Sequence, residues 1–226
     1  MARRPRTAPG GLAYHVMNRS SGHLVLFEDV GDYEAFERVL GQVRTREGMR
    51  VCAYTLMPNH FHLVVWPAED GQLSRFMQWL TMTHTQRWHA HRHDAGRGHL
   101  YQSRFKSFPI QRDAHFLSVC RYVERNPAAA GLVERAEDWP WGSLACRVGK
   151  LQKAAALLDE WPVQRPRGWK RLVNTAPGDE ELESLRRSVR RGQPFGSPVW
   201  TKRTACALGL ESTLRPVGRP KRAKRE

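Results

Sequence analysis

The fold of this chain is decided by residues 51–66, which read VCAYTLMPNHFHLVVW. Two apolar runs with the character of β-strands, 51–56 and 60–66, lie on either side of Met57-Pro58-Asn59. A Pro-Asn pair between two apolar runs is a turn signal. The two runs are therefore predicted to pair as a β-hairpin.

Further strands and helices are predicted on both sides of this hairpin. Short runs of aromatic and β-branched residues indicate strands, whereas apolar residues at helical spacing indicate helices. In chain order, the sequence predicts a strand at 14–18, a helix from an N-cap at Asp32 to Gly48, a helix at 73–88, a strand at 100–110, and a helix that begins after Asp113 and stops before Pro127. This order predicts an α+β fold, with helices laid on an antiparallel sheet.

The charge of the chain indicates its kind of partner. Its 226 residues include 37 Lys and Arg against 22 Asp and Glu, giving a formal net charge of +15. Such a positive field favours nucleic acid, because neutralising phosphates releases their counterions. A ribosome-bound protein, or a basic surface inherited from an arginine-rich proteome, would also fit this composition.

Other features of the composition exclude several classes of protein. The four cysteines are too widely scattered for a zinc ribbon or a disulfide scaffold. No apolar run of signal-peptide length follows the basic N-terminus, and no stretch has the length and hydropathy of a membrane span. We therefore expect a cytoplasmic protein that associates with the nucleoid.

The length of the chain fits one main globular domain with an appendage. Beyond about Ser143 the sequence changes character, and a Pro-, Gly- and Arg-rich stretch at 162–178 precedes a charged helix at 179–191. We predict a main domain over residues 10–147 and a basic C-terminal extension over residues 148–226.

Two histidines in the hairpin are the first candidate site. Because side chains alternate along a strand, His60 and His62 leave the same face of the sheet while Phe61 enters the other. Two imidazoles side by side suit a divalent metal and leave coordination positions open for water and a phosphate oxygen. A pair of surface histidines on a half-exposed strand is the alternative.

A tyrosine on the last predicted helix is the second candidate. Tyr122 and Asn126 lie one helical turn apart on its polar face, so they can act at one site. A phenol with a pKa of about 10 needs a nearby cation or metal before it can attack phosphorus. Taken by itself, a tyrosine at such a position is more typical of a structural aromatic residue with its hydroxyl at the surface.

Several spaced motifs together resemble the REP-associated tyrosine transposases, chromosomal relatives of the single-tyrosine HUH transposases of small insertion sequences. The resemblance covers about residues 10–147, and the motifs occur in the family's order. They are MPNHFHLV at 57–64, GHLYQSRF at 98–105, YVERNP at 122–127, AGLV at 130–133 and WPW at 139–141.

The resemblance implies a ferredoxin-like HUH nuclease fold and a set of catalytic residues. His60 and His62 match the two HUH histidines, which bind Mg²⁺ or Mn²⁺, and Tyr122 matches the nucleophile that forms a 5′-phosphotyrosine. Asn126 occupies the position of a metal-binding glutamine in insertion-sequence relatives. For the proton of the tyrosine, metal-bound water, Glu124 and solvent all remain open as acceptors.

The resemblance also implies the substrate, a single-stranded repetitive extragenic palindrome folded as a DNA hairpin. It implies no nucleotide cofactor, since the phosphotyrosine keeps the bond energy, and it fits either a monomer or a homodimer. From the residues, we expect phosphate contacts from basic side chains and stacking of aromatic rings on unpaired bases. The basic candidates are Arg19, Arg104, Lys106 and Arg112, and the aromatic candidates are Tyr101 and Phe105; a solvated basic face with core aromatics is the alternative.

The end of the chain resembles an AT-hook peptide. Residues 215–222 place Gly-Arg-Pro between basic residues, so Arg219, Lys221 and Arg222 are candidates for the minor groove of A·T-rich DNA. Val217 stands where such hooks usually have arginine, and non-specific tethering explains the tail as well.

Two other functions compete with strand cleavage. The first is a protein that binds DNA hairpins or represses transcription without cutting, which the basic charge alone would serve. The second is an RNA-binding protein on a similar sheet.

Overall fold

The computed structural model describes residues 7–93, 98–150 and 156–215. Its four strands form one antiparallel sheet in the order β2-β3-β1-β4. This is the order of a ferredoxin-like βαββαβ unit, so the predicted α+β fold is confirmed. The strands are β1 (Ala13–Arg19), β2 (Arg50–Met57), β3 (His60–Trp66) and β4 (Lys106–Ile110).

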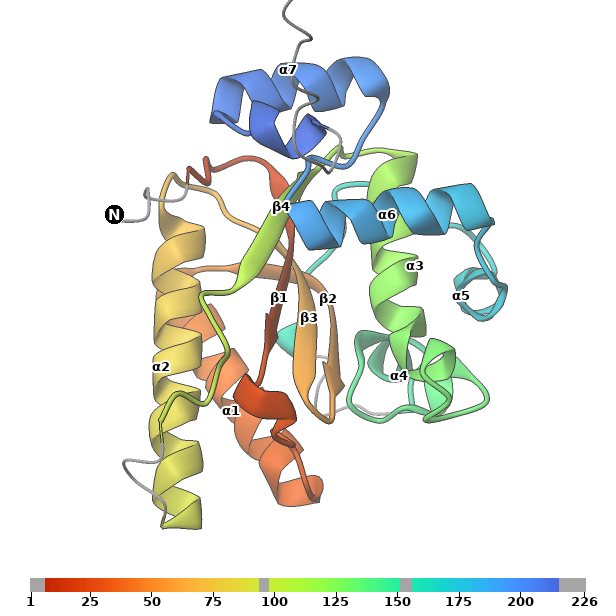
Figure 1. The fold of residues 1–226 in the computed structure, drawn as a ribbon. Helices are drawn as coiled ribbons and strands as arrows, with labels where there is room; N and C mark the ends of the chain where they lie inside the picture. Colours follow the sequence, from red (N-terminus) through yellow and green to blue (C-terminus); the bar gives the residue numbers. More distant parts are fainter. Residues whose placement is uncertain (1–6, 94–97, 151–155, 216–226) are drawn as a thin grey trace, which may run out of the picture.

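Helices cover both faces of the sheet (Figure 1). The long helices α1 (Val30–Glu47) and α2 (Gln72–Arg92) pack together over one face, and α3 (Ala114–Ala129) packs on the other. Because strand side chains alternate, β3 sends Phe61 and Leu63 into the core under α1 and α2, while Val64 packs towards α3. The sheet therefore separates two hydrophobic cores.

The C-terminal elements pack against the outside of α3 and the β4 edge. Helix α6 crosses α3 (Figure 1), and Phe195 extends the edge by accepting a backbone hydrogen bond from Gln111 at 2.9 Å and donating one to Pro109 at 2.9 Å. The remaining elements are η1 (Ser21–His23), η2 (Ala136–Asp138), α4 (Ser143–Arg147), α5 (Trp169–Asn174), α6 (Asp179–Arg191), α7 (Pro198–Leu208) and η4 (Glu211–Leu214).

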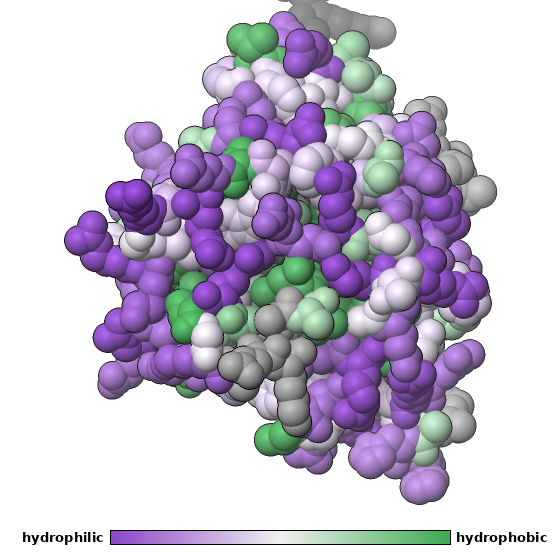
Figure 2. Space-filling model, turned by 180° about the vertical axis from the view of Figure 1, so that it is seen from behind, coloured by the Kyte–Doolittle hydropathy of each residue, from purple (hydrophilic) through white to green (hydrophobic). Residues whose placement is uncertain are grey.

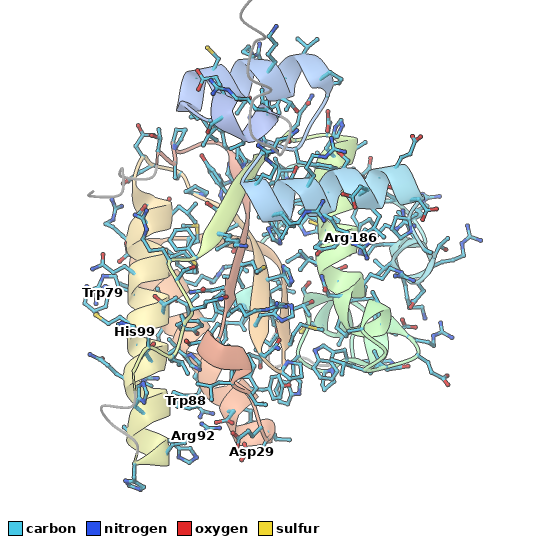
Figure 3. The ribbon with its side chains drawn as sticks, in the orientation of Figure 1. Asp29, Trp79, Trp88, Arg92, His99 and Arg186 are labelled. Atoms are coloured by element: carbon cyan, nitrogen blue, oxygen red, sulfur yellow. The ribbon has the colours of Figure 1, made fainter. Side chains whose placement is uncertain are left out.

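The first two helices differ from their predicted bounds because of one acidic residue. Asp29, not Asp32, is the N-cap of α1, and its side chain accepts from the Asp32 amide at 3.0 Å. Asp32 instead accepts from Arg92 at 2.7 Å, which ties the start of α1 to the last turn of α2. Figure 3 shows Arg92 near the N-cap residue Asp29. Helix α2 therefore continues four residues beyond the predicted end at Trp88.

The third helix differs from its prediction because it continues through Pro127. A proline has no N–H, so the carbonyl of Val123, four residues earlier, lacks its usual helical partner. The hydroxyl of Thr55 in β2 lies 2.8 Å from that carbonyl and can donate its one proton to it, rather than to the Tyr54 carbonyl at the same distance. The strand thus satisfies the group that the proline leaves unpaired, and the helix can continue. The fourth strand is also shorter than predicted, because only 106–110 of the expected 100–110 pair with β1.

The exterior is polar. Hydrophilic side chains cover most of the face that is turned away in Figure 1 (Figure 2). Among the described residues, none of the helices combines the length and hydropathy that crossing a membrane requires.

Candidate active site

The two histidines of β3 face the side of the sheet that α3 covers. In the sheet register, His60 lies opposite Arg19 and His62 lies opposite Met17 of β1. The two imidazole rings are neighbours, with 5.0 Å between their centroids. Their predicted placement on one face is confirmed.

Hydrogen bonds engage one nitrogen of each ring. The Nδ1 atom of His60 lies 2.7 Å from the side-chain oxygen of Asn59, which can only accept, so this nitrogen carries the proton. The Nδ1 atom of His62 lies 2.8 Å from Nε2 of His15. When His62 donates from Nδ1 to His15, both Nδ1 atoms carry protons and the Nε2 lone pairs are the ones left for a metal.

Burial keeps these imidazoles neutral. It lowers the pKa of His60, together with the positive charge of Arg19, to about 4. It also holds the pKa of His62 well below the usual range, with the neighbouring His15, His60 and Arg19 acting in the same direction. A metal would therefore not have to displace a proton from either ring near neutral pH.

His15 is a residue of this site that the sequence interpretation missed. It lies in β1 and is 1% exposed, with its ring stacked on Phe108 at a centroid distance of 4.8 Å. Burial lowers its pKa to about 3, so it accepts or donates as a neutral ring. A histidine inside an otherwise apolar strand run was the signal that could have identified it.

Tyr122 lies beside these histidines in the same chain. Its ring centroid is 5.8 Å from that of His62 and 6.3 Å from that of His15. Helix α3 rises from the Asp113 cap, where the side chain accepts from the His115 amide at 2.8 Å. Packing of the apolar side of α3 on the sheet then leaves the Tyr122 side chain at the edge of the core, next to the imidazoles.

The environment of the phenol contains opposing effects. Burial raises the pKa of Tyr122 above the ordinary value of 10.0, whereas hydrogen bonding from Asn126 and the charges of Arg186 and Arg19 lower it. Arg186 comes from α6, at the place where that helix crosses α3 (Figure 3). The phenol is therefore flanked by one arginine from β1 and one from the C-terminal region.

Asn126 is held one turn after Tyr122. Its side-chain nitrogen donates to the Tyr122 backbone carbonyl at 3.1 Å, so its oxygen is the end that a metal could use. Within the described residues, no group of three or more His, Cys, Asp or Glu side chains could hold a metal. Two neutral imidazoles suit a divalent ion that would complete its shell with water and DNA oxygens, and the amide oxygen of Asn126 is a ligand type that such an ion accepts.

Glu124 is not placed to act on the phenol. Its carboxylate is 1% exposed and accepts from the Ser143 hydroxyl at 2.6 Å and the Trp169 indole at 2.6 Å. Burial raises its pKa, against the effect of these two hydrogen bonds. It joins α3 to α4 and α5, and this corrects the view of Glu124 as a candidate base.

Three of the predicted basic contacts lie together near the histidines. Arg19, Arg104 and Lys106 are exposed and line one small hollow between β1 and the segment that leads into β4. Arg112 is not with them. Its guanidinium lies 5.1 Å from the ring centroid of Trp66, at the end of β3 away from His60.

The predicted aromatic contacts lie on the other side of the sheet. Tyr101 and Phe105 line a hollow of about 680 Å³ against α2. The Tyr101 hydroxyl is 2.7 Å from Nδ1 of the buried His84, so this side chain is also part of the packing under α2. The tail residues Arg219, Lys221 and Arg222 lie outside the described residues.

Comparison with known proteins identifies the family of the chain. Residues 10–126, more than half of the chain, match the family model described as "Transposase IS200 like". A solved REP-associated tyrosine transposase bound to a REP hairpin is similar in fold, with a TM-score of 0.50 and 18% identity over 66% of this chain and 86% of that one.

A candidate transposase from Deinococcus radiodurans R1 has a TM-score of 0.39 and 16% identity, over 54% of this chain and 96% of that one. Among curated proteins, none matches the chain. The family match spans the strands and the helix that carry His60, His62 and Tyr122. The expected kinship with transposases is confirmed, and the chain belongs to the family of IS200-like transposases.

Proposed function

We propose that this transposase cuts and rejoins single-stranded DNA through a 5′-phosphotyrosine at Tyr122. His60, His62 and the oxygen of Asn126 would hold the divalent ion, Mg²⁺ or Mn²⁺. The observation that carries the proposal is the convergence of Tyr122 and His62 from two different elements, with 5.8 Å between ring centroids. A phosphate between them would meet a nucleophile on one side and metal-binding nitrogens on the other.

Each residue has a defined part in this reaction. The bound ion would polarise the phosphoryl oxygen and stabilise the charge that builds up on it. The Tyr122 oxygen attacks phosphorus as the phenol gives its proton to water. The bond from phosphorus to the 3′ oxygen breaks, and this oxygen takes a proton from water to become a free 3′ hydroxyl. Attack of a 3′ hydroxyl on the phosphotyrosine reverses these steps and rejoins a strand without a nucleotide cofactor.

The substrate that we propose is a DNA hairpin formed by a repetitive extragenic palindrome. The proposal draws on the resemblance of the sequence motifs and on the similar fold of the relative bound to a REP hairpin. Arg19, Arg104 and Lys106, close to the histidines, would position the strand by its phosphates. The cell compartment that fits this substrate is the cytoplasm, at the nucleoid.

A cleavage assay with end-labelled hairpin oligonucleotides tests the proposal. With Mg²⁺ or Mn²⁺, the wild-type protein should form a covalent adduct that withstands denaturing electrophoresis and contains the strand's 5′ phosphate. Tyr122→Phe should lose the adduct entirely, and His62→Ala should reduce its rate by at least a hundredfold. Tyr33→Phe, a change of the same kind in α1, is the matched control and should behave as wild type.

Two outcomes would contradict the proposal. If Tyr122→Phe formed the adduct at the wild-type rate, the assignment of the nucleophile would be wrong. If the wild-type protein bound the hairpin tightly but never cut it, the protein would be a hairpin-binding or repressor protein instead. Cleavage of DNA but not of RNA of the same sequence would exclude the RNA-binding alternative.

A further inference from the structure

Helices α3 and α6 enclose a pocket of about 430 Å³ next to Tyr122. Three arginines line it, Arg121 and Arg125 from α3 and Arg186 from α6. Figure 3 places Arg186 where the two helices cross. The volume lies in the range of small-ligand sites, which is roughly 300–1,000 Å³.

The arginines are only partly neutralised within the protein. Arg121 is engaged, because it donates to the Thr175 carbonyl at 2.6 Å and lies 3.7 Å from Glu181. The Nε atom of Arg125 is buried and has no hydrogen-bond partner in the described part of the chain. Among the same residues, Arg186 has no acidic partner within 4.0 Å. Arg125 and Arg186 therefore line the pocket with no carboxylate partner among these residues, while Glu181, which also lines it, pairs with Arg121.

The pocket and the histidine site have Tyr122 in common. Tyr122 and Asn126 line the pocket, but His60 and His62 do not. The pocket and the histidine site therefore meet at Tyr122. For a strand cut at Tyr122, the pocket adjoins the reacting phosphate, so a neighbouring phosphate is the group that it would receive.

Packing fixes the helix that completes the pocket. On α6, Leu185 is 2% exposed and Ser188 is 1% exposed, so this side of the helix is part of the core against α3. Arg186 follows Leu185 directly in the chain, so the packing of Leu185 in the core fixes the backbone position of Arg186. A helix of this kind is a fixed part of the site, unlike a loose basic tail.

We propose that this pocket binds a phosphate of the DNA strand next to the one that is cut, through Arg125 and Arg186. The proposal rests on the proposed function, because it takes Tyr122 as the point where the strand is cut. Guanidinium groups suit the purpose, since they stay charged and can offer two parallel hydrogen bonds to a phosphate. The C-terminal region would then supply part of the substrate site of the catalytic domain.

Equilibrium binding of a single-stranded hairpin oligonucleotide without divalent metal tests this pocket apart from catalysis. Arg186→Ala and Arg125→Ala should each weaken binding about tenfold, and each should reduce the slope of log K against log salt by about 0.7, the value for one lost phosphate contact on a single strand. Arg187→Ala is the matched control, because it removes the same charge from an exposed neighbour that does not line the pocket. Arg186→Lys should recover part of the loss.

A neutral methylphosphonate placed at single positions of the oligonucleotide identifies the phosphate. At the position that the pocket binds, the modification should weaken wild-type binding, and Arg186→Ala should then cause no further loss. Equal slopes for Arg186→Ala and Arg187→Ala, or tighter binding by Arg186→Ala, would overturn the proposal; the second result would mean that α6 obstructs the site. Because binding is measured without metal, a failure of Tyr122 as nucleophile would leave these results unchanged.

Discussion

The imidazole ring of His62 has two nitrogens. Its Nδ1 atom is hydrogen-bonded to Nε2 of His15 at 2.8 Å, and the direction of this bond determines whether Nε2 of His62 can bind a metal. If His62 Nδ1 carries the proton and donates to His15, the lone pair of His62 Nε2 is free and aimed at the site. The opposite tautomer would leave Nε2 protonated and unable to bind a metal. His15 is therefore a positioning residue in the proposed reaction, because it acts through His62 without touching the substrate.

Substituting His15 tests this role at the scale of one residue. His15→Phe keeps the ring stacked on Phe108 but removes the acceptor for His62, so the Mn²⁺ concentration for half-maximal cleavage should rise about 10- to 100-fold. His15→Gln places an amide oxygen near the former Nε2 and should restore most of the metal affinity. A metal titration of cleavage measures both, with the thermal midpoint as a check on folding. A merely structural role would lower the midpoint for both variants and leave the metal dependence unchanged.

At the scale of elements, the alternation of side chains along strands and the residue types of turns predicted the features that depend on local sequence. The hairpin at 51–66, the shared face of His60 and His62, and the polar face of the helix that carries Tyr122 follow from patterns within a few residues. The partner of His62 could not be predicted this way, because β1 lies far away in the chain and joins β3 only in the folded sheet.

The ends of the helices also depend on contacts between residues far apart in the chain, which local sequence does not predict. Asp29 and Asp32 are both acceptable caps by sequence, and the choice depends on Arg92, sixty residues away, which takes the Asp32 carboxylate. Pro127 is a stop signal unless some other group pairs with the carbonyl of Val123, and only the fold brings Thr55 to it. Glu124 looked available for catalysis until α4 and α5 were seen to bind its carboxylate.

Substituting Thr55 tests the account of the proline in α3. Thr55→Val keeps the shape of a fully buried side chain but leaves the Val123 carbonyl unpaired, so the free energy of unfolding should fall by about 1–3 kcal/mol. Thr81→Val is the matched control, because the Met77 carbonyl that Thr81 bonds keeps its backbone partner within α2. Urea unfolding curves measure the difference. Equal stability of the two variants would mean that Thr55 does not compensate for the proline.

At the scale of the whole molecule, a single chain brings the phenol of Tyr122 beside the imidazoles of the proposed site. The phenol comes from α3, the imidazoles from β1 and β3, and the flanking arginines from β1 and α6. The C-terminal elements pack against the outside of α3 (Figure 1), so α3 is held beside its own sheet. We therefore expect Tyr122 to act on a phosphate bound at the histidines of the same chain, with no exchange of helices between two copies.

Mixing two inactive variants tests most directly whether Tyr122 acts at the histidines of its own chain. Tyr122→Phe lacks the phenol but keeps its histidines, and His60→Ala/His62→Ala lacks the histidines but keeps its phenol. When the two are mixed and incubated with hairpin DNA and Mn²⁺, the account predicts no more covalent adduct than either protein gives by itself, while the wild-type protein forms it readily. Adduct formation restored by the mixture would contradict the account, because the tyrosine would then act at the histidines of another chain.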